Sequence, residues 1–311
     1  MFRTDFPDPF VLPHDGGYLA FATNATKLRA NVQVARSPDL LRWSLLAKGG
    51  KLHDAMPRLP EWAEPGRTWA PEVIRVGERY LLYFTARERK SGLQCVGVAS
   101  AADPLGPYAS SAAAPLVCQR DQGGTIDASP FRDTDGKLYL YFKNDGNNPA
   151  VLKPSRIWVQ RLTSDGMALT GSAINLIRNE LYWEWRVVES PAMTRTSDGG
   201  YVLFFSANHF GWETDQRLSN YAMGYATCQG PLGPCLKSPS NPILKSYFSK
   251  AHGCLSGPGH QTIFEVRGKQ YLAFHAWSAK PNCRPANEGR YMYIAPLEWQ
   301  GNAPVIGASL R

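Results

Sequence analysis

Residues 187–205 read VVESPAMTRTSDGGYVLFF, and this stretch contains the pattern on which the fold prediction depends. Glu189 stands just before a short apolar segment, the turn Asp198-Gly199-Gly200 follows, and a second apolar segment begins at Tyr201. Two short apolar segments joined by a glycine turn are typical of a β-hairpin. We therefore expect a hairpin here, with a carboxylate at the start of its first strand.

The second strand of this hairpin recurs four more times along the chain. The five aromatic runs are YLAF at 18–21, YLLYF at 80–84, YLYF at 139–142, YVLFF at 201–205 and YLAF at 271–274. Their first tyrosines lie 62, 59, 62 and 70 residues apart in chain order. A near-regular period over a whole chain indicates a repeat architecture.

A first strand and a turn precede each aromatic run, and a polar residue begins each first strand. These polar residues are Asp8, Glu72, Asp127, Glu189 and His260. Antiparallel sheets repeated in this way form a β-propeller, whose innermost strands line a central channel. The sequence thus predicts an all-β, five-bladed β-propeller with a central funnel. We expect one domain over residues 1–311, with the five polar groups in equivalent places at the funnel.

The composition is that of a globular protein with a large core. Of the 311 residues, 43% are hydrophobic and only 19% are charged, which excludes a disordered chain. The net charge is +8, but the basic residues are scattered and form no nucleic-acid-binding motif. No segment approaches the ~18 consecutive apolar residues of a membrane span. We expect a monomer without a nucleic-acid partner, a membrane or an organic cofactor.

Six cysteines form an even set without a CxxC pair or zinc-like spacing to histidine. Six cysteines allow fifteen disulfide connectivities, and the simplest joins neighbours along the chain. That connectivity pairs Cys95 with Cys118, Cys228 with Cys235, and Cys254 with Cys283. Three disulfides fit an oxidising compartment, whereas six buried thiols would fit the cytosol. We expect a secreted or otherwise extracytoplasmic protein whose signal peptide is absent from this chain.

Several carboxylates around one funnel match the requirements of glycosidic bond cleavage. One carboxyl group must donate a proton while another activates a water molecule. Trp69 lies beside Glu72 in the chain, and an indole face suits the apolar C–H surface of a sugar ring. Trp183 and Trp185 are further candidate platforms for sugars. A non-catalytic glycan-binding propeller is the alternative from another class, and it would lack at least one of the carboxylates.

At the level of motifs, the chain resembles glycoside hydrolase family 43, which contains five-bladed propellers acting as arabinanases, arabinofuranosidases and β-xylosidases. The resemblance covers essentially the whole chain. It rests on PDPF at 7–10, RSPDLLRW at 36–43, TWAPEV at 68–73, IDASPFRDTDG at 126–136, VESPAM at 188–193 and GPGHQT at 257–262.

This resemblance implies roles for individual residues. Asp8 would be the general base, Glu189 the general acid, and Asp127 the group that raises the acid's pKa and orients it. The family inverts configuration, which requires ~6.5–9.5 Å between acid and base. His260 would be associated with a metal ion, often calcium, reached through water. Arg290 would hold the sugar in the cleavage subsite.

The substrate prediction follows from the same resemblance. Many relatives have Asp where this chain has Glu72, which we expect to contact substrate together with Trp69. The chain ends at Arg311 without the C-terminal β-sandwich of many family xylosidases, which favours arabinose over xylose. We expect an enzyme that cleaves terminal α-L-arabinofuranosyl linkages of arabinan or arabinoxylan with inversion. A β-xylosidase or an endo-1,5-α-L-arabinanase of the same family is the alternative.

Overall fold

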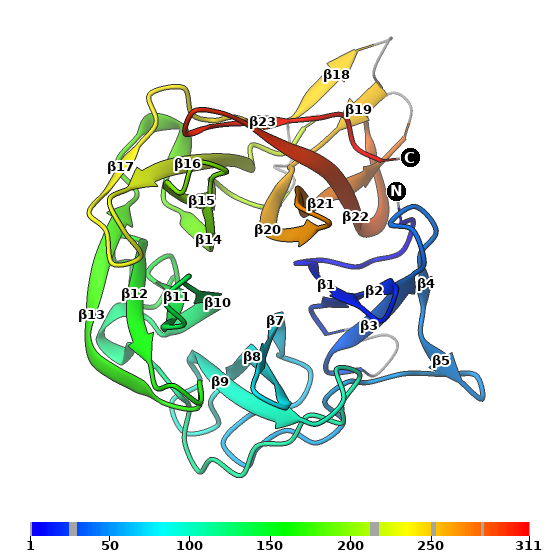
Figure 1. Ribbon diagram of the computed structural model, residues 1–311, viewed down its shortest axis with the longest axis vertical. Coiled ribbons are helices and arrows are strands. Elements are labelled where there is room, and N and C mark those ends of the chain that lie inside the picture. Colours follow the sequence, from blue (N-terminus) through cyan, green and yellow to red (C-terminus); the bar gives the residue numbers. More distant parts are fainter. Residues whose placement is uncertain (1, 25–29, 212–217, 250–252, 281–282, 311) are drawn as a thin grey trace.

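Five antiparallel sheets surround a common axis in the computed structural model, which describes residues 2–24, 30–211, 218–249, 253–280 and 283–310 (Figure 1). The ring of sheets confirms the five-bladed β-propeller. Each aromatic run forms the second strand of one blade, and the segment before it forms the first strand. The repeat period in the sequence is therefore the blade period.

The strands of each blade follow one another in chain order. Blade 1 consists of β1 (Phe10–His14), β2 (Gly17–Ala22), β3 (Gln33–Ser37) and β4 (Ser44–Leu45). Blade 2 consists of β7 (Trp69–Val76), β8 (Arg79–Arg87) and β9 (Gln94–Ala101). Blade 3 consists of β10 (Thr125–Arg132), β11 (Leu138–Asn144), β12 (Arg156–Leu162) and β13 (Leu169–Arg178).

The last two blades complete the ring. Blade 4 consists of β14 (Val188–Arg195), β15 (Tyr201–Ala207), β16 (Ala222–Cys228) and β17 (Cys235–Lys237). Blade 5 consists of β20 (Gly259–Val266), β21 (Lys269–Ala279), β22 (Pro285–Gln300) and β23 (Ala303–Ile306). Two small hairpins lie outside the blades, β5 (Ala47–Lys48) with β6 (Lys51–Leu52) and β18 (Tyr247–Ser249) with β19 (Gly253–Leu255). The described part of the chain also contains two short 3-10 helices, η2 (Arg120–Gln122) and η3 (Tyr182–Glu184).

The hydrophobic core lies between neighbouring blades. The second strands are buried on both faces, and all seven residues of β11 are buried. A strand covered on both faces needs apolar residues at successive positions, which explains the unbroken aromatic runs in the sequence. Phe84, Phe142 and Phe204 are fully buried between blades in this way.

The N-terminal segment closes the ring against blade 5. The Phe2 N–H donates to the carbonyl of Met292 at 3.2 Å, and the Phe6 N–H donates to the carbonyl of Arg290 at 2.8 Å. The Thr262 hydroxyl donates to the carbonyl of Pro9 at 3.0 Å. This closure brings residues from both ends of the chain to the same side of the funnel.

Three disulfides connect the cysteines that are neighbours along the chain, as expected. Cys228–Cys235 joins the two outer strands of blade 4, and Cys254–Cys283 joins β19 to the segment before β22. Within the described residues, no helix has the length and hydrophobicity needed to cross a membrane.

Candidate active site

A bulge interrupts the first strand of four blades at the funnel. The pairing of first and second strands shifts between Trp69 and Glu72, and at the matching places in blades 3, 4 and 5. Each bulge contains one non-glycine residue with positive φ, and a fifth such residue precedes β1. The five are Asp8 (56°), Ala70 (44°), Asp127 (57°), Ser190 (53°) and His260 (51°). Bulges re-aim side chains and are common beside active sites.

These five residues occupy equivalent positions in the five blades. The sequence analysis had placed Glu72 and Glu189 at these positions in blades 2 and 4, and that prediction was wrong because Ala70 and Ser190 occupy them. Glu72 lies two residues after the equivalent position of its blade, and Glu189 lies one residue before it. A regular strand sends successive side chains to opposite faces, whereas a bulge lets two neighbours face the same way. Glu189 therefore reaches the funnel beside Ser190, while Glu72 lies further along the channel wall.

A cavity of about 470 Å³ opens at the end of the channel where the bulges lie. Its lining includes six of the residues expected from the sequence, Asp8, Trp69, Asp127, Glu189, His260 and Arg290. The expected substrate contact Glu72 is not part of this lining. It is half-buried, and burial raises its pKa to about 8, with a Ser129 hydrogen bond opposing and the Asp127 charge adding to the shift.

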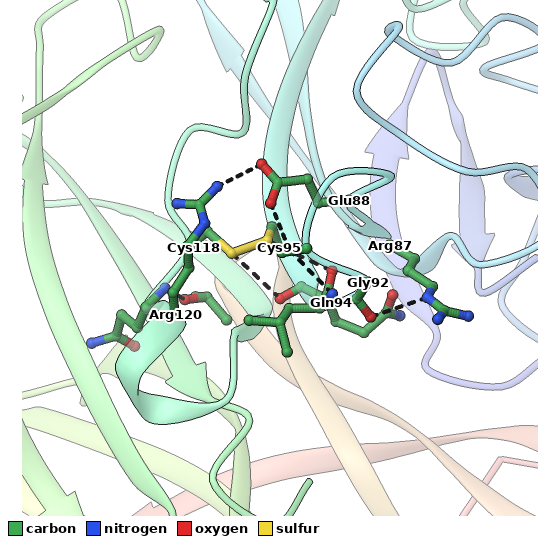
Figure 2. The surroundings of a disulfide bond; sticks show 11 residues. Arg87, Glu88, Gly92, Gln94, Cys95, Cys118 and Arg120 are labelled. Atoms are coloured by element: carbon green, nitrogen blue, oxygen red, sulfur yellow. Dashed lines mark hydrogen bonds and ion pairs between the residues drawn. A yellow bond between two sulfur atoms is a disulfide. The ribbon is translucent and has the colours of Figure 1, made fainter. Parts of the chain in front are cut away.

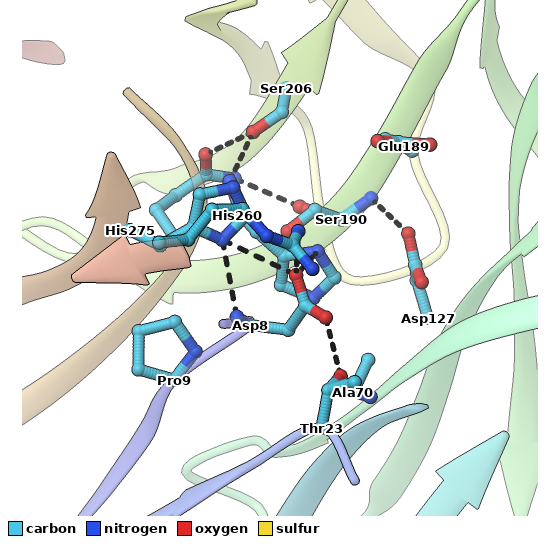
Figure 3. A network of polar contacts seen from close by, with 12 residues as sticks. Asp8, Pro9, Thr23, Ala70, Asp127, Glu189, Ser190, Ser206, His260 and His275 are labelled. Carbon is cyan, nitrogen blue, oxygen red and sulfur yellow. Dashed lines mark hydrogen bonds and ion pairs between the residues drawn. The ribbon is translucent and has the colours of Figure 1, made fainter. Parts of the chain in front are cut away.

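The bulges leave backbone N–H groups that the sheet does not pair, and the preceding blade satisfies them (Figure 3). The Ala70 N–H donates to the Thr23 hydroxyl, and the Asp127 N–H donates to the Thr85 hydroxyl. In the same way the His260 N–H donates to Ser206, and the Asp8 N–H donates to Nδ1 of His275. In four of the five blades, a polar side chain near the end of the second strand thus anchors the positive-φ residue of the next blade.

Blade 3 breaks this pattern, and it does so next to Glu189. Its second strand carries Lys143 at the anchoring position, and an ammonium group accepts no hydrogen bond. The carboxylate of Asp127 accepts the Ser190 N–H instead, at 2.9 Å. Lys143 is fully buried and lies 3.2 Å from Oε2 of Glu189, while the Tyr221 hydroxyl donates to Oε1 at 2.7 Å. Both oxygens of Glu189 are thus held by residues from neighbouring elements.

Asp8 is surrounded by cationic and polar groups. Its Oδ1 lies 3.1 Å from Arg290 Nη1, 3.2 Å from His275 Nδ1 and 3.3 Å from His260 Nδ1, and its Oδ2 accepts from the Thr23 hydroxyl. Burial alone would raise the pKa of Asp8, but Arg290, followed by His260 and His275, holds it well below its usual range. Burial, followed by the Arg290 charge, lowers the pKa of His275 to about 4. Asp8 is therefore a carboxylate, and His275 is a neutral ring, at neutral pH.

Asp127 has the opposite electrostatic environment. Burial raises its pKa to about 6, and the charges of Glu189 and Asp8 add to the shift, whereas His260 and Lys143 oppose it. The Asp127 carboxyl therefore stays protonated up to a pH about two units higher than an exposed aspartate does. Asp8 and Asp127 therefore have very different pKa values although they line the same cavity.

Arg290 is fixed by aromatic contacts as well as by Asp8. Its guanidinium lies 5.2 Å from the ring centre of Phe210 and 5.8 Å from that of Trp277. The cation–π contacts and the ion pair together orient the guanidinium toward the cavity that it lines.

A disulfide supports the wall of the cavity in blade 2 (Figure 2). Cys95 follows the cavity residue Gln94 on β9, and its bond to Cys118 ties the segment before η2 to that strand. The Arg120 guanidinium forms an ion pair with Glu88 at 2.5 Å next to this disulfide. Two bonds therefore hold this wall, the disulfide between Cys95 and Cys118 and the ion pair between Arg120 and Glu88.

The expected calcium ion was tested against the residues around His260. Among the described residues, one group of three His, Cys, Asp or Glu side chains has ligand atoms that all lie within 4.8 Å of one another, and it consists of Glu88, Cys95 and Cys118. Their two sulfurs are joined in a disulfide, so they are not a metal site. His260 offers one nitrogen beside a carboxylate that already faces Arg290, which does not fit directly coordinated calcium because calcium prefers several oxygen ligands. Calcium bound through water stays a prediction, and no step proposed below uses it.

The sequence analysis missed four groups of the site, Lys143, Asp145, Tyr221 and His275. Lys143 lies 3.6 Å from Asp145, and both line the cavity. A signal existed for two of the four, because a polar residue stands one or two positions after each aromatic run. These residues are Thr23, Thr85, Lys143, Ser206 and His275. Tyr221 precedes β16, outside the repeated pattern, and nothing in the sequence marked it.

Comparison with known proteins adds evidence of relationship. A family model described as glycosyl hydrolases family 43 matches residues 1–304. A β-D-galactofuranosidase (xynD) of Aspergillus niger is 30% identical over 254 residues, which are 77% of this chain and 64% of that protein. An arabinoxylan arabinofuranohydrolase of Bacillus subtilis is 25% identical over 280 residues, 83% of this chain and 50% of that protein. The chain thus spans between half and two thirds of the length of these two relatives.

Solved structures agree with this relationship. The chain is similar to a thermostable family-43 glycoside hydrolase, with 28% identity, a TM-score of 0.81 and coverage of 99% of this chain and 94% of that one. It is also similar to an endo-1,4-β-xylanase from Bacteroides thetaiotaomicron, with 28% identity and a TM-score of 0.78 over 99% of this chain and 97% of that one.

Proposed function

The chain belongs to glycosyl hydrolases family 43 and is a glycosidase by that membership. On this premise we propose that it removes terminal α-L-arabinofuranosyl residues from arabinan or arabinoxylan with inversion of configuration. The observation that carries the proposal is one cavity lined by Asp8, Asp127 and Glu189, in which Asp8 is held ionised and the Glu189 carboxyl is held at both oxygens by Lys143 and Tyr221. An inverting glycosidase needs one carboxylate and one carboxylic acid at the same site.

In the proposed reaction, Asp8 acts as the general base. A water molecule attacks the anomeric carbon, and its proton passes to the Asp8 carboxylate as the new C–O bond forms. Glu189 gives its proton to the glycosidic oxygen as the bond to the leaving group breaks. The low pKa of Asp8 makes it a weak base, but it guarantees that the carboxylate is available over the whole working range of pH.

Asp127 and Lys143 support the acid in this scheme. Asp127 is protonated below about pH 6, because burial raises its pKa and the Glu189 charge adds to the rise. The Lys143 ammonium and the Tyr221 hydroxyl fix the Glu189 carboxyl from two sides. Lys143 and Tyr221 are therefore positioning residues, whose contacts keep the carboxyl aimed at the leaving-group oxygen.

The substrate class follows from the cavity walls and the relatives. Trp69 offers a half-buried indole face for a sugar ring, and Arg290 offers a donor fork for its hydroxyls. Relatives are named for arabinoxylan, for arabinan and for galactofuranose. An arabinofuranoside shares the five-membered ring with the last of these. The three disulfides, together with a relative described as extracellular, support a secreted protein.

A substrate panel tests the proposal. We expect hydrolysis of 4-nitrophenyl α-L-arabinofuranoside and release of arabinose from branched arabinan, with β-L-arabinofuranose as the first anomer seen by proton NMR. Hydrolysis of the β-D-xyloside alone would identify a β-xylosidase, oligosaccharides released from linear arabinan would identify an endo-arabinanase, and the β-D-galactofuranoside tests the Aspergillus niger relationship. Release of the α-anomer first would contradict inversion.

The pH profile tests the role of Asp127. We expect kcat/KM to fall above about pH 6, where the buried Asp127 carboxyl, whose pKa is raised to about 6, loses its proton. Asp127→Asn can still accept the Ser190 N–H but cannot ionise, so the basic limb should no longer lie near pH 6. Asp135→Asn, an exposed aspartate in the same blade, is the matched control and should leave the profile unchanged. An unmoved basic limb in Asp127→Asn would remove Asp127 from the proton balance.

A further inference from the structure

Exposed and half-buried aromatic side chains gather on blade 4 and in the segment before it, beside the cavity. We define the aromatic ledge as Tyr182, Trp183, Trp185, His209 and Phe210. Tyr182 is fully exposed, Trp185 is 52% exposed and Phe210 is 44% exposed. Single exposed aromatic residues need no explanation, but a contiguous exposed group marks an interaction site.

The backbone at the centre of the aromatic ledge is strained. Trp185 has φ 48° and ψ −115°, a sparsely populated backbone region for a residue with a bulky side chain. Its carbonyl accepts from Asn179, and the buried Glu184 next to it accepts the N–H groups of Glu180 and Leu181 and pairs with Lys237. This framework fixes the backbone while the indole stays exposed. Packing of the indole therefore does not explain the strain.

The ledge is continuous with the catalytic cavity. The rings of Trp185 and His209 lie 6.3 Å apart, and those of His209 and Phe210 lie 5.4 Å apart. Phe210 lines the cavity and contacts Arg290, which pairs with Asp8. A second hollow of about 840 Å³ is lined by residues that include Tyr182, Trp183 and Trp185.

The ledge belongs to the blade that carries the proposed acid. The segment of η3 leads directly into β14 and Glu189, and the Asn208 N–H donates to the carbonyl of Val187, which links both halves of the ledge to this strand. A general acid must lie next to the glycosidic oxygen, so the leaving group lies on the side of the acid. The ledge is therefore where a polymeric leaving group would extend.

The chemistry of the ledge suits a neutral glycan. Aromatic faces stack on the C–H surfaces of sugar rings, and polar side chains nearby can bind hydroxyl groups. Asn179, Asn208 and Asn220 line the second hollow together with Trp183 and supply amide groups next to the aromatic rings. We propose that the aromatic ledge binds the sugar residues on the leaving-group side of the scissile bond, which makes the enzyme selective for oligomeric and polymeric substrates. This inference rests on the proposed function.

Trp185→Ala tests the ledge, because it removes the central ring without touching the cavity. We expect kcat/KM to fall about tenfold for linear arabinotetraose or for arabinose-substituted xylotetraose, mostly through KM. The rate on 4-nitrophenyl α-L-arabinofuranoside, whose leaving group is too short to cover the ledge, should stay within about twofold of wild type. Phe248→Ala is the matched control, since Phe248 is 51% exposed and lines a different hollow. An equal loss on both kinds of substrate, or no loss on either, would overturn the proposal.

Binding measurements separate this proposal from the reaction. Calorimetric titration of the same oligosaccharides into Glu189→Gln and into Glu189→Gln/Trp185→Ala should show about tenfold weaker binding in the double variant. If the wild type hydrolyses no glycoside of the panel, the proposed function fails. The titration then tests by itself whether the aromatic ledge binds glycans. Equal affinities would overturn the ledge proposal. So would a sedimentation result in which the wild type is a dimer that Trp185→Ala dissociates, because the ledge would then be an interface between copies.

Discussion

Glu189→Gln should lower kcat on natural arabinosides by about a thousandfold, the contribution of a positioned general acid. The amide retains the shape of the side chain and can still accept from Tyr221, but it has no proton of suitable acidity to give. Circular dichroism should show an intact fold, and KM should change little because the lost interaction acts in the transition state. Initial rates on arabino-oligosaccharides measure the effect.

The dependence on the leaving group distinguishes an acid from a merely structural glutamate. The loss in Glu189→Gln should be much smaller on 4-nitrophenyl α-L-arabinofuranoside, because 4-nitrophenolate leaves with little protonation. Glu78→Gln, with a side chain 96% exposed in the turn between β7 and β8, is the matched control and should retain the wild-type rate on both substrates. The same loss on both substrates in Glu189→Gln would contradict the role of proton donor.

Asp8→Asn should lower kcat by about 10³- to 10⁴-fold on every substrate, whatever its leaving group. Activation of water is needed even when the leaving group departs easily, so the activated aryl glycoside should not rescue this variant. The contrast with Glu189→Gln assigns the two carboxyl groups to different halves of the reaction. If Asp8→Asn lost activity only on substrates with poor leaving groups, Asp8 would be the proton donor and not the base.

The same substitution also affects the charge balance of the site. Asp8→Asn leaves the Arg290 guanidinium without its anionic partner, and breaking a buried pair is strongly destabilising. We therefore expect a lower melting temperature, and activity should be compared at a temperature where circular dichroism shows a folded protein. Asp15→Asn is the matched control, since Asp15 lies exposed in the turn that follows β1 and tolerates asparagine at its φ of 41°. An unchanged melting temperature would show that Arg290 finds another partner.

The propeller could be predicted from the sequence because its signal is local and repeated. Each aromatic run is a strand buried on both faces, and each is preceded by a turn and a first strand, so the pattern alone indicates five similar blades. The motifs at Asp8, Asp127 and Glu189 were likewise visible as carboxylates at the starts of first strands. Their meeting at one cavity followed from the radial arrangement of the blades.

The sequence did not reveal the register at the funnel. The predicted equivalence of Glu72 with Asp8 and Asp127 failed because the bulge places Ala70 at that position. A shift of one or two residues along a strand turns a side chain to the other face or moves it along the sheet. The same shift changes the distance to the next tyrosine by only one or two positions, and the repeats already differ by that amount. The spacing in the sequence therefore could not reveal the register.

The residues that tune the carboxylates come from distant parts of the chain. His275 and Arg290 contact Asp8 across 267 and 282 positions, and these contacts exist because the N-terminal segment closes the ring against blade 5. Lys143 contacts Glu189 from the neighbouring blade, at the one position where the anchoring pattern is broken. The sequence by itself determined the blades and the carboxylates, since both depend on short-range patterns. Only the tertiary structure decided which charges surround each carboxylate, because burial and ring closure set the distances on which its pKa depends.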